Sequence, residues 1–233
     1  MNQNQVQEHF AKQADDYESL MVRLVPYYRE QSKIISDLLP TKDRAYRVLD
    51  LGCGNGILSE MVFRKLPNSY VVGLDLTLGM LNAFEKKLSG YAGKFELRQA
   101  DYRSDDIGKE YDIVIAGLTL HHLTWEEREN FYRTIYSALN QSGLFISQDI
   151  IIDEDPMVAE NQYAHWKAFM KSQGEDPEFW YSKHREKDHP VTLSDHFAWL
   201  KQAGFSKVTC QWRYCNFMIT KAEKIQVGSN GKT

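Results

Sequence analysis

The stretch from Arg47 to Asp75 constrains this chain more than any other, because it reads as a strand, a glycine-rich turn, a helix and a second strand. An apolar run begins at Val48 and is typical of a buried parallel strand. Glycines follow at positions 52, 54 and 56. Glycine lacks Cβ, so such a turn can take left-handed dihedral angles and let a ligand approach the backbone. The pattern predicts one βαβ unit with a nucleotide site at its first turn.

The spacing of the glycines indicates which nucleotide is bound. A dinucleotide fold would read G-x-G-x-x-G, with its third glycine at the position of Ile57. The sequence reads D-L-G-C-G-N-G instead, with Asp50 before the turn and Asp75 closing the next strand. This arrangement resembles motif I and the acidic loop of the class I S-adenosylmethionine-dependent methyltransferases. The plainer alternative is a turn made only for packing, with Asp75 as a helix cap.

The resemblance implies an α/β, Rossmann-like fold with a seven-stranded, mostly parallel sheet and an antiparallel last strand. It also implies S-adenosyl-L-methionine as the cofactor. In the family, the first acid and the glycines hold the methionine part, and the second acid accepts both ribose hydroxyls. The resemblance places the cofactor on Tyr28, Asp50, Gly52, Cys53, Gly54, Asp75, Leu76, Asp101, Tyr102 and Gly117.

Two of these positions have plainer alternatives. Tyr28 would place its ring against the sulfonium end of the cofactor, where a cation is attracted to a π-system, but it could equally be a core aromatic residue. Asp101 would accept a hydrogen bond from the adenine amino group, or it could be a turn residue.

A closer resemblance exists to the carboxy-S-adenosylmethionine synthases of tRNA wobble-uridine modification. It is carried by V-P-Y-Y, D-L-G-C-G, a long insertion, L-K-Q-A-G-F and W-R-Y-C-N-F. Two departures stand out. Trp199 occupies the position where we expect an arginine for the extra carboxylate, and Gly117 replaces an asparagine. Without that cation a carboxylated sulfonium loses its counter-charge, so the sequence favours ordinary S-adenosylmethionine and a methyl product.

The catalytic candidates are His121 and His122, in T-L-H-H-L after the fourth predicted strand. In class I methyltransferases this strand end faces the methyl group and the substrate. Each histidine could be a general base or a structural hydrogen-bonding residue. We expect no metal site, because the four histidines after residue 160 lack the paired spacing of metal ligands.

We expect residues 1–233 to form a single domain, with a helical cap at 1–40 that is broken at Pro26. A second helical segment, 153–190, is inserted between strands five and six. This insertion carries six aromatic residues that predict a lid over a small-molecule substrate or, equally, a homodimer interface: Tyr163, Trp166, Phe169, Phe179, Trp180 and Tyr181.

Composition limits the partners. A net charge of −4 and a pI near 6.0 make nucleic acid an unlikely partner, and no apolar run is long enough for a membrane span. Three cysteines and no evident secretory signal predict a cytoplasmic protein. The leading prediction is methyl transfer to a small-molecule acceptor. The alternatives are a carboxy-S-adenosylmethionine synthase-like enzyme and a non-catalytic S-adenosylmethionine-binding protein.

Overall fold

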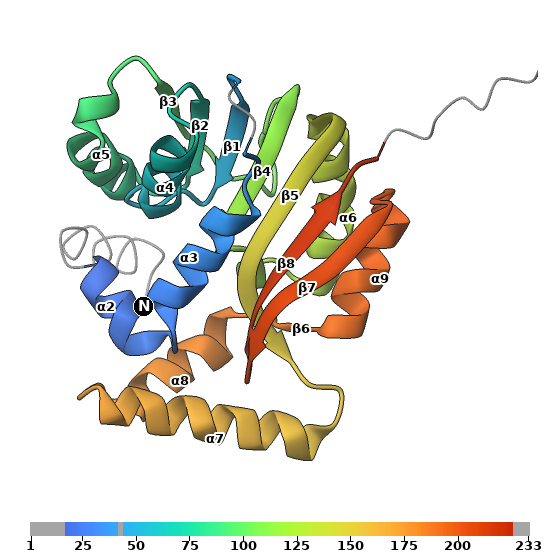
Figure 1. Cartoon of the computed structure of the whole chain (residues 1–233). Helices are drawn as coiled ribbons and strands as arrows, with labels where there is room; N and C mark the ends of the chain where they lie inside the picture. Colours follow the sequence, from blue (N-terminus) through green and yellow to red (C-terminus); the bar gives the residue numbers. More distant parts are fainter. Residues whose placement is uncertain (1–16, 42–43, 226–233) are drawn as a thin grey trace, which may run out of the picture.

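The computed structural model describes residues 17–41 and 44–225, and a single large sheet runs through its centre (Figure 1). Seven strands follow the order β3-β2-β1-β4-β5-β8-β7, and the short β6 pairs with β5 off this path. The strands are β1 (Arg47–Leu51), β2 (Tyr70–Asp75), β3 (Phe95–Gln99), β4 (Tyr111–Gly117), β5 (Leu139–Ile152), β6 (Val191–Thr192), β7 (Lys207–Tyr214) and β8 (Phe217–Glu223).

Helices cover both faces of this sheet (Figure 1). They are α2 (Tyr17–Leu24), α3 (Tyr28–Leu38), α4 (Ile57–Lys65), α5 (Leu78–Lys87), α6 (Trp125–Ala138), α7 (Pro156–Ser172), α8 (Pro177–Lys187) and α9 (Leu193–Ala203). Two 3₁₀ turns, η1 (Ser89–Tyr91) and η2 (Leu120–His122), complete the elements of the described part of the chain.

The direction of the strands confirms the predicted fold class. β1 to β5 are parallel, β8 runs antiparallel to β5, and β7 runs antiparallel to β8. The last strand of the chain is therefore inserted between β5 and β7, and β7 forms the edge of the sheet. This is the arrangement expected of a class I methyltransferase.

Alternation along the strands divides the core into two layers. Leu49 and Leu51 are fully buried against α6 and α9, whereas Val48 is fully buried against α3, α4 and α5. Successive side chains of a strand point to opposite faces, so a strand that is buried on both sides reads as a continuous apolar run. Asp50 interrupts that run on the α4 side, which brings a carboxylate to the first turn.

Several local boundaries differ from the sequence prediction. The apolar run predicts the fifth strand from Leu144 to Ile152, but β5 begins at Leu139, because Leu139 pairs with Tyr111 before a register shift in the ladder. The two-residue strand β6 was not predicted, since it is too short to show any periodicity. Thr77 precedes α5 but its side chain caps nothing; Asp75 instead accepts the backbone N–H of Thr77 at 2.8 Å.

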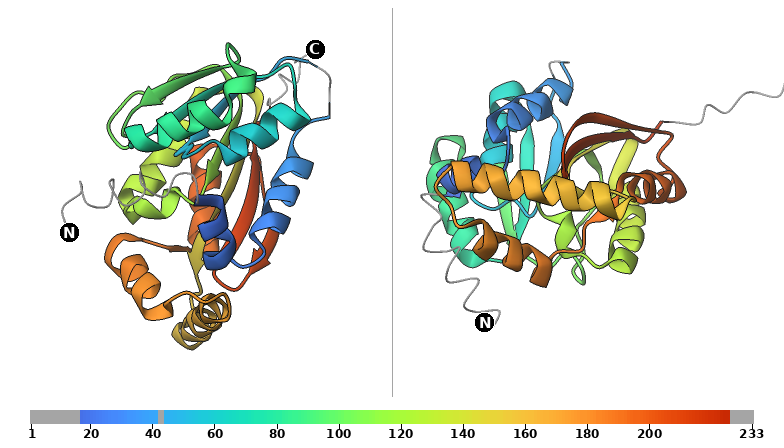
Figure 2. Two further views of the ribbon diagram at one scale, coloured as in Figure 1. Left: turned by 90° about the vertical axis from the view of Figure 1, so that its left-hand side faces the viewer. Right: turned by 90° about the horizontal axis from the view of Figure 1, so that it is seen from below.

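Gly174 and Pro177 predict a division of the insertion into two short helices, and it does form two, α7 and α8, although α7 is long, with 17 residues. Figure 2 shows α7 crossing beneath the carboxyl ends of the parallel strands, with α8 beside it. Two of its aromatics, Tyr163 and Trp166, are buried in a core cluster with α2 and α3. Trp166 Nε1 also donates to the carbonyl of Leu24 at 2.7 Å. These two rings therefore support the chain's own packing rather than lining an open substrate site or a subunit interface.

The end of the insertion is anchored to the segment after β4. The backbone N–H of His189 donates to the carbonyl of His121 at 2.6 Å, and Trp125 Nε1 donates to the carbonyl of Pro190 at 3.2 Å. At the other side, Arg23 of α2 forms an ion pair with Glu175 at 2.5 Å. Opening the insertion as a lid would break these contacts. The lid function remains a prediction, as does a homodimer.

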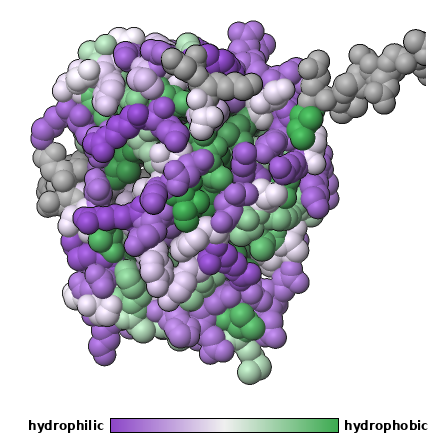
Figure 3. Space-filling model, in the orientation of Figure 1, coloured by the Kyte–Doolittle hydropathy of each residue, from purple (hydrophilic) through white to green (hydrophobic). Residues whose placement is uncertain are grey.

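None of the helices in residues 17–41 and 44–225 combines the length and apolar character required to cross a membrane. On the face in Figure 3, hydrophobic residues are interrupted by hydrophilic ones.

Candidate functional site

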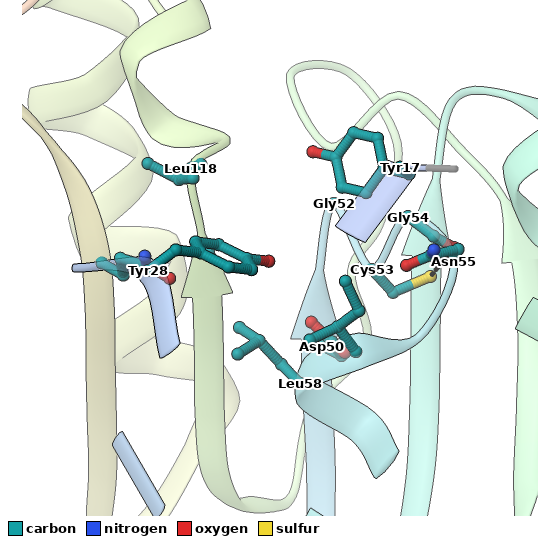
Figure 4. A pocket seen from close by; sticks show the side chains of 12 residues that line it. Tyr17, Tyr28, Asp50, Gly52, Cys53, Gly54, Asn55, Leu58 and Leu118 are labelled. Carbon is teal, nitrogen blue, oxygen red and sulfur yellow. Dashed lines mark hydrogen bonds between the residues drawn. The ribbon is translucent and has the colours of Figure 1, made fainter. Parts of the chain in front are cut away.

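A pocket lies at the carboxyl end of β1, between the glycine turn and the helices α2 and α3 (Figure 4). Its cavity volume is about 40 Å³. Twelve residues line it: Tyr17, Tyr28, Asp50, Gly52, Cys53, Gly54, Asn55, Ile57, Leu58, Gly117, Leu118 and Gln148. Six of the ten predicted cofactor residues are therefore brought together in one cavity.

The shape of the glycine turn explains its residues. Gly52 and Gly54 both have positive φ, at 61° and 52°, in the left-handed region that glycine tolerates. A Cβ on Gly52 would also lie 2.3 Å from Thr119 Oγ1, so the turn and the segment after β4 pack too closely for any side chain. The Cys53 N–H donates to the carbonyl of Leu74 at 2.9 Å and fixes the turn against β2.

Asp75 holds the turn from the neighbouring strand. Its Oδ2 accepts the N–H of Gly54 at 3.0 Å, while Oδ1 accepts the N–H of Thr77. Burial raises the pKa of Asp75, and these two N–H groups together with His122 oppose the shift. Asp75 lies outside the pocket lining, but it is bonded directly to the turn that forms the lining. Its predicted ribose contact stays a prediction.

Asp50 is the acid inside the pocket. It is 1% exposed, and Ser59 Oγ donates to its Oδ2 at 2.6 Å. Burial raises the pKa of Asp50 to about 7, and the nearby Asp75 adds to the shift, whereas the hydrogen bond from Ser59 opposes it. A buried carboxylate of this kind would be stabilised by a cationic ligand, such as an ammonium group.

Tyr28 extends from α3 across the pocket toward the glycine turn, between Leu118 and Leu58 (Figure 4). Both predicted roles of Tyr28 are compatible with this position, because its side chain is 8% exposed and belongs to the cluster with α7 while also lining the cavity. Burial raises its pKa well above the ordinary value, so the phenol is neutral at pH 7.

Three of the predicted cofactor residues lie elsewhere. Leu76 is 40% exposed at the end of β2. Asp101 is held by Arg103, whose Nε and Nη2 donate to its two oxygens at 2.9 and 2.7 Å, and this cation lowers the pKa of Asp101. Tyr102 turns its hydroxyl to the carbonyl of Thr119 at 2.8 Å. For Asp101 to contact adenine, the pairing with Arg103 would have to change.

The two departures from the carboxy-sulfonium pattern have different structural meanings. Trp199 lies on α9 and packs into the cluster with α6, outside the pocket lining. Trp199 therefore does not contact this pocket, and the consequence that we drew from it stays a prediction. Gly117 does line the pocket, and a Cβ there would meet Leu58 Cδ1 at 2.6 Å.

The two candidate catalytic histidines have different environments. His121 is 5% exposed, and its Nδ1 lies 2.6 Å from Asp149 Oδ1. Asp149 in turn forms a fully buried ion pair with Arg128, at 2.6 Å. The side chain of His122 is 54% exposed, and its Nδ1 lies 3.0 Å from Asp188 Oδ1. Asp188 comes from the end of the insertion, far away in the sequence.

Charges around these histidines set their protonation. Burial opposes the charged form of His121, but Asp188 and Asp149 outweigh it and raise its pKa. Although part of the His122 side chain is exposed, the protein packed around the rest of the ring displaces water and lowers its pKa. The neighbouring His121 lowers this pKa further, and Asp188 opposes the shift. Burial alone would raise the pKa of Asp188, yet His121, His122 and His184 hold it below its usual range.

Potential ligand atoms of His121, His122 and Asp188 lie within 4.8 Å of one another, which is close enough for one metal ion. The oxygens of Asp188 already accept hydrogen bonds from His122 Nδ1 and, at 2.8 Å, from His184 Nδ1. These hydrogen bonds account for the cluster without an ion. The absence of a metal stays a prediction.

Sequence analysis missed six lining residues, among them Tyr17, Asn55 and Gln148. Gln148 Nε2 donates to Gln31 Oε1 at 2.9 Å, and Gln31 is itself completely buried. Gln148 is a polar residue within the apolar run of β5, and this could have identified it in the sequence as a candidate lining residue. The spacing of Val6, Phe10, Ala14 and Tyr17 predicts one helical face, but the first three of these residues lie outside the described part of the chain.

Comparison with known proteins agrees with this geometry. Residues 48–143 match the family model described as a methyltransferase domain, and this range runs from β1 into β5. Residues 48–143 are a class I methyltransferase domain. The fold of the whole described chain agrees: a putative O-methyltransferase from Nostoc punctiforme superposes with a TM-score of 0.66 at 19% identity, covering 92% of this chain. DhpI in complex with SAH superposes with a TM-score of 0.65 at 15% identity, covering 94%.

Curated relatives resemble this chain over nearly its whole length. The carboxy-S-adenosyl-L-methionine synthase of Campylobacter hominis is 26% identical over 216 residues, which covers 91% of this chain and 92% of the relative. The protein of the same name from Nitratiruptor sp. is 28% identical over 220 residues, with 91% and 90% covered. The chain spans a smaller share, 60%, of the O-methyltransferase from Nostoc punctiforme.

Proposed function

We propose that the chain binds S-adenosyl-L-methionine in the pocket at the end of β1 and converts its sulfonium methyl group to a carboxymethyl group. The observation that carries this proposal is the similarity to carboxy-S-adenosyl-L-methionine synthases over about nine tenths of both chains. This reading replaces simple methyl transfer as the leading candidate. The substrates would be small molecules: the sulfonium compound and a carboxylate donor.

The chemistry of the pocket supports a cationic ligand. Asp50 lies within the lining, Asp75 holds the turn beside it, and the ring of Tyr28 faces the same space. Carboxylates stabilise the ammonium group of the methionine part, and an aromatic face attracts a sulfonium. The positive φ of Gly52 and Gly54 lets the ligand approach the backbone closely.

Methyl transfer to a small molecule is the second candidate, and one observation favours it. None of the twelve residues that line the pocket in the described chain is a lysine or an arginine. A carboxylated sulfonium carries an additional negative charge, which is costly to bury without a partner. An ordinary S-adenosylmethionine has no such requirement.

Mass spectrometry separates these candidates. The purified protein is denatured and the released small molecules are analysed, and the protein is then incubated with S-adenosyl-L-methionine and a bacterial small-molecule extract. A sulfonium heavier than S-adenosylmethionine by one CO₂ supports the synthase. Accumulation of the demethylated sulfide together with a methylated acceptor supports methyl transfer instead. A bound cofactor with neither product would indicate a non-catalytic binding protein.

A further inference from the structure

Hydrogen bonding around Asp188 fixes the tautomer of His122. An ionised carboxylate only accepts hydrogen bonds, so a neutral imidazole bonded to it through Nδ1 must carry its proton on that nitrogen. The carboxylate of Asp188 accepts a hydrogen bond from His122 Nδ1 at 3.0 Å and another from His184 Nδ1 at 2.8 Å. His184 Nε2 can therefore accept a hydrogen bond from the hydroxyl of Tyr163, at 3.2 Å. The second nitrogen of His122, Nε2, is left with a lone pair.

His121 is unsuited to the same task. Its Nδ1 faces Asp149, and its Nε2 lies 3.8 Å from Asp188 Oδ2, so the buried ring stands between two carboxylates. That environment favours the imidazolium form, which has no lone pair to accept a proton. Sequence alone placed the two histidines side by side and slightly favoured His121 as the base.

The position of His122 relates it to the cofactor pocket. It follows Leu118, which lines the pocket, and Thr119, which packs against Gly52. Its charge also acts on Asp75 across the end of the sheet. More than half of its side-chain surface is exposed, so a substrate can reach the ring.

We infer that His122 Nε2 is the proton-transfer group of the reaction, and that Asp188 is a positioning residue that holds His122 in the required tautomer. This inference rests on the proposed function. The insertion thus supplies part of the active site through its last residues, Asp188 included, and does more than cover the site.

The proton balance of the proposed reaction gives His122 a defined task. The sulfonium acidifies its methyl group, and His122 Nε2 takes one proton from that carbon. The electron pair left on the carbon forms a bond to the carboxyl carbon of the donor, whose own carbon–carbon bond breaks. The donor keeps that electron pair and receives the proton back from His122. No oxidant or reductant is required.

The charged groups that face His122 are His121 from η2, Asp188 after α8, Asp149 from β5 and Asp75 at the end of β2. Together with the loss of water, they leave its pKa below the ordinary value, so the ring is neutral at pH 7. Loss of the Asp188 charge would lower this pKa further.

Nitrogen-15 NMR of histidine-labelled full-length protein tests the tautomer without any substrate. We expect the His122 resonances, assigned with His122→Gln, to report a proton on Nδ1. Asp188→Ala removes the acceptor and should shift His122 toward the Nε2-protonated form. Asp188→Asn keeps an acceptor oxygen and should preserve the tautomer. An Nε2-protonated His122 in the wild-type protein would overturn the inference.

Kinetics then tests the role. His122→Gln should lower turnover by about 10²–10⁴-fold with cofactor affinity retained. Asp188→Asn should shift the acidic limb of the pH–rate profile to lower pH, because the lost negative charge no longer favours the imidazolium. His165→Gln, on the exposed surface of α7, is the matched control and should change neither. Wild-type turnover in His122→Gln overturns the inference, whereas a wild-type protein without turnover overturns the proposed function and leaves the NMR result intact.

Discussion

The N–H of Gly54 donates to Oδ2 of Asp75 at 3.0 Å, which joins the glycine turn after β1 to the end of β2. Residues 21 positions apart are thereby joined beside the pocket, which Gly54 lines and Asp75 does not. The acid that the sequence assigned to the ribose also organises the turn, and both tasks use its oxygens. A carboxylate has about four lone-pair sites, so it can perform both at once.

Substitution of Asp75 tests this double task. Asp75→Ala should weaken binding of S-adenosyl-L-methionine by about 1.5–3 kcal/mol, the value of hydrogen bonds to a charged group, because the turn loses its anchor and the ribose its acceptor. Isothermal titration calorimetry measures the change. Glu85→Ala, on the exposed surface of α5, should bind as the wild type does. Unchanged affinity in folded Asp75→Ala would contradict both roles.

Asp50 makes stability depend on pH. Its pKa is raised to about 7 by burial, so the folded state holds a proton that the unfolded state loses near pH 4. The resulting stability is fully present at lower pH and is lost as pH rises from about 4 through 7. Asp50→Asn should therefore raise the free energy of unfolding at pH 8, on the order of 3 kcal/mol, and have little effect at pH 4.

Urea denaturation at both pH values checks the prediction for Asp50. Ser59 Oγ, which donates to the Asp50 carboxylate, can donate to the asparagine oxygen as well, so the substitution keeps that contact. An equal effect of Asp50→Asn at pH 4 and pH 8 would show that ionisation of Asp50 is not the cause. Saturating S-adenosyl-L-methionine should reduce the difference, because a bound ammonium group favours the ionised acid.

The buried pair of Arg128 and Asp149 should be essential for folding. Asp149→Asn leaves an unpaired guanidinium in the core and should cost about 3–5 kcal/mol of stability. The exposed i,i+4 pair of Arg133 and Glu129 provides the control, since Glu129→Gln should cost only about 0.3–0.5 kcal/mol. Both changes are measured by chemical denaturation. A cost below about 1 kcal/mol for Asp149→Asn would mean that water or another group compensates the charge of Arg128.

Trp166 should matter for stability rather than for substrate affinity. It is 7% exposed and packs between α2 and the sheet, so Trp166→Ala should cost about 3–5 kcal/mol. Phe179, at 43% exposure in the same insertion, serves as the control, and Phe179→Ala should be nearly neutral in stability. Thermal unfolding compares the two variants. A raised KM with unchanged stability in Trp166→Ala would restore the direct lid role.

Local sequence determined the elements that depend on neighbouring residues. Glycines at positions 52 and 54 allow left-handed backbone directly after an apolar strand, so the βαβ unit follows from a single stretch. The spacing of Thr124 and Glu127 predicts a capping box, and the structure has it, because all its partners lie within one turn of helix. Gly174 and Pro177 likewise separate the two helices of the insertion, because glycine follows the end of α7 and proline occupies the first position of α8.

Side-chain partners distant in the sequence were settled only by the three-dimensional packing. Asp188 reaches His122 across 66 positions, and Trp166 reaches Leu24 across 142, and no local pattern encodes either distance. For the same reason, the place of Trp199 in a sequence segment does not tell which face of α9 it occupies; the structure packs it into the cluster with α6, outside the pocket lining. Burial and electrostatics depend on the whole surrounding volume. They alone distinguish His121, which is buried and paired with Asp149, from His122, which is exposed, although the two residues are adjacent in the chain.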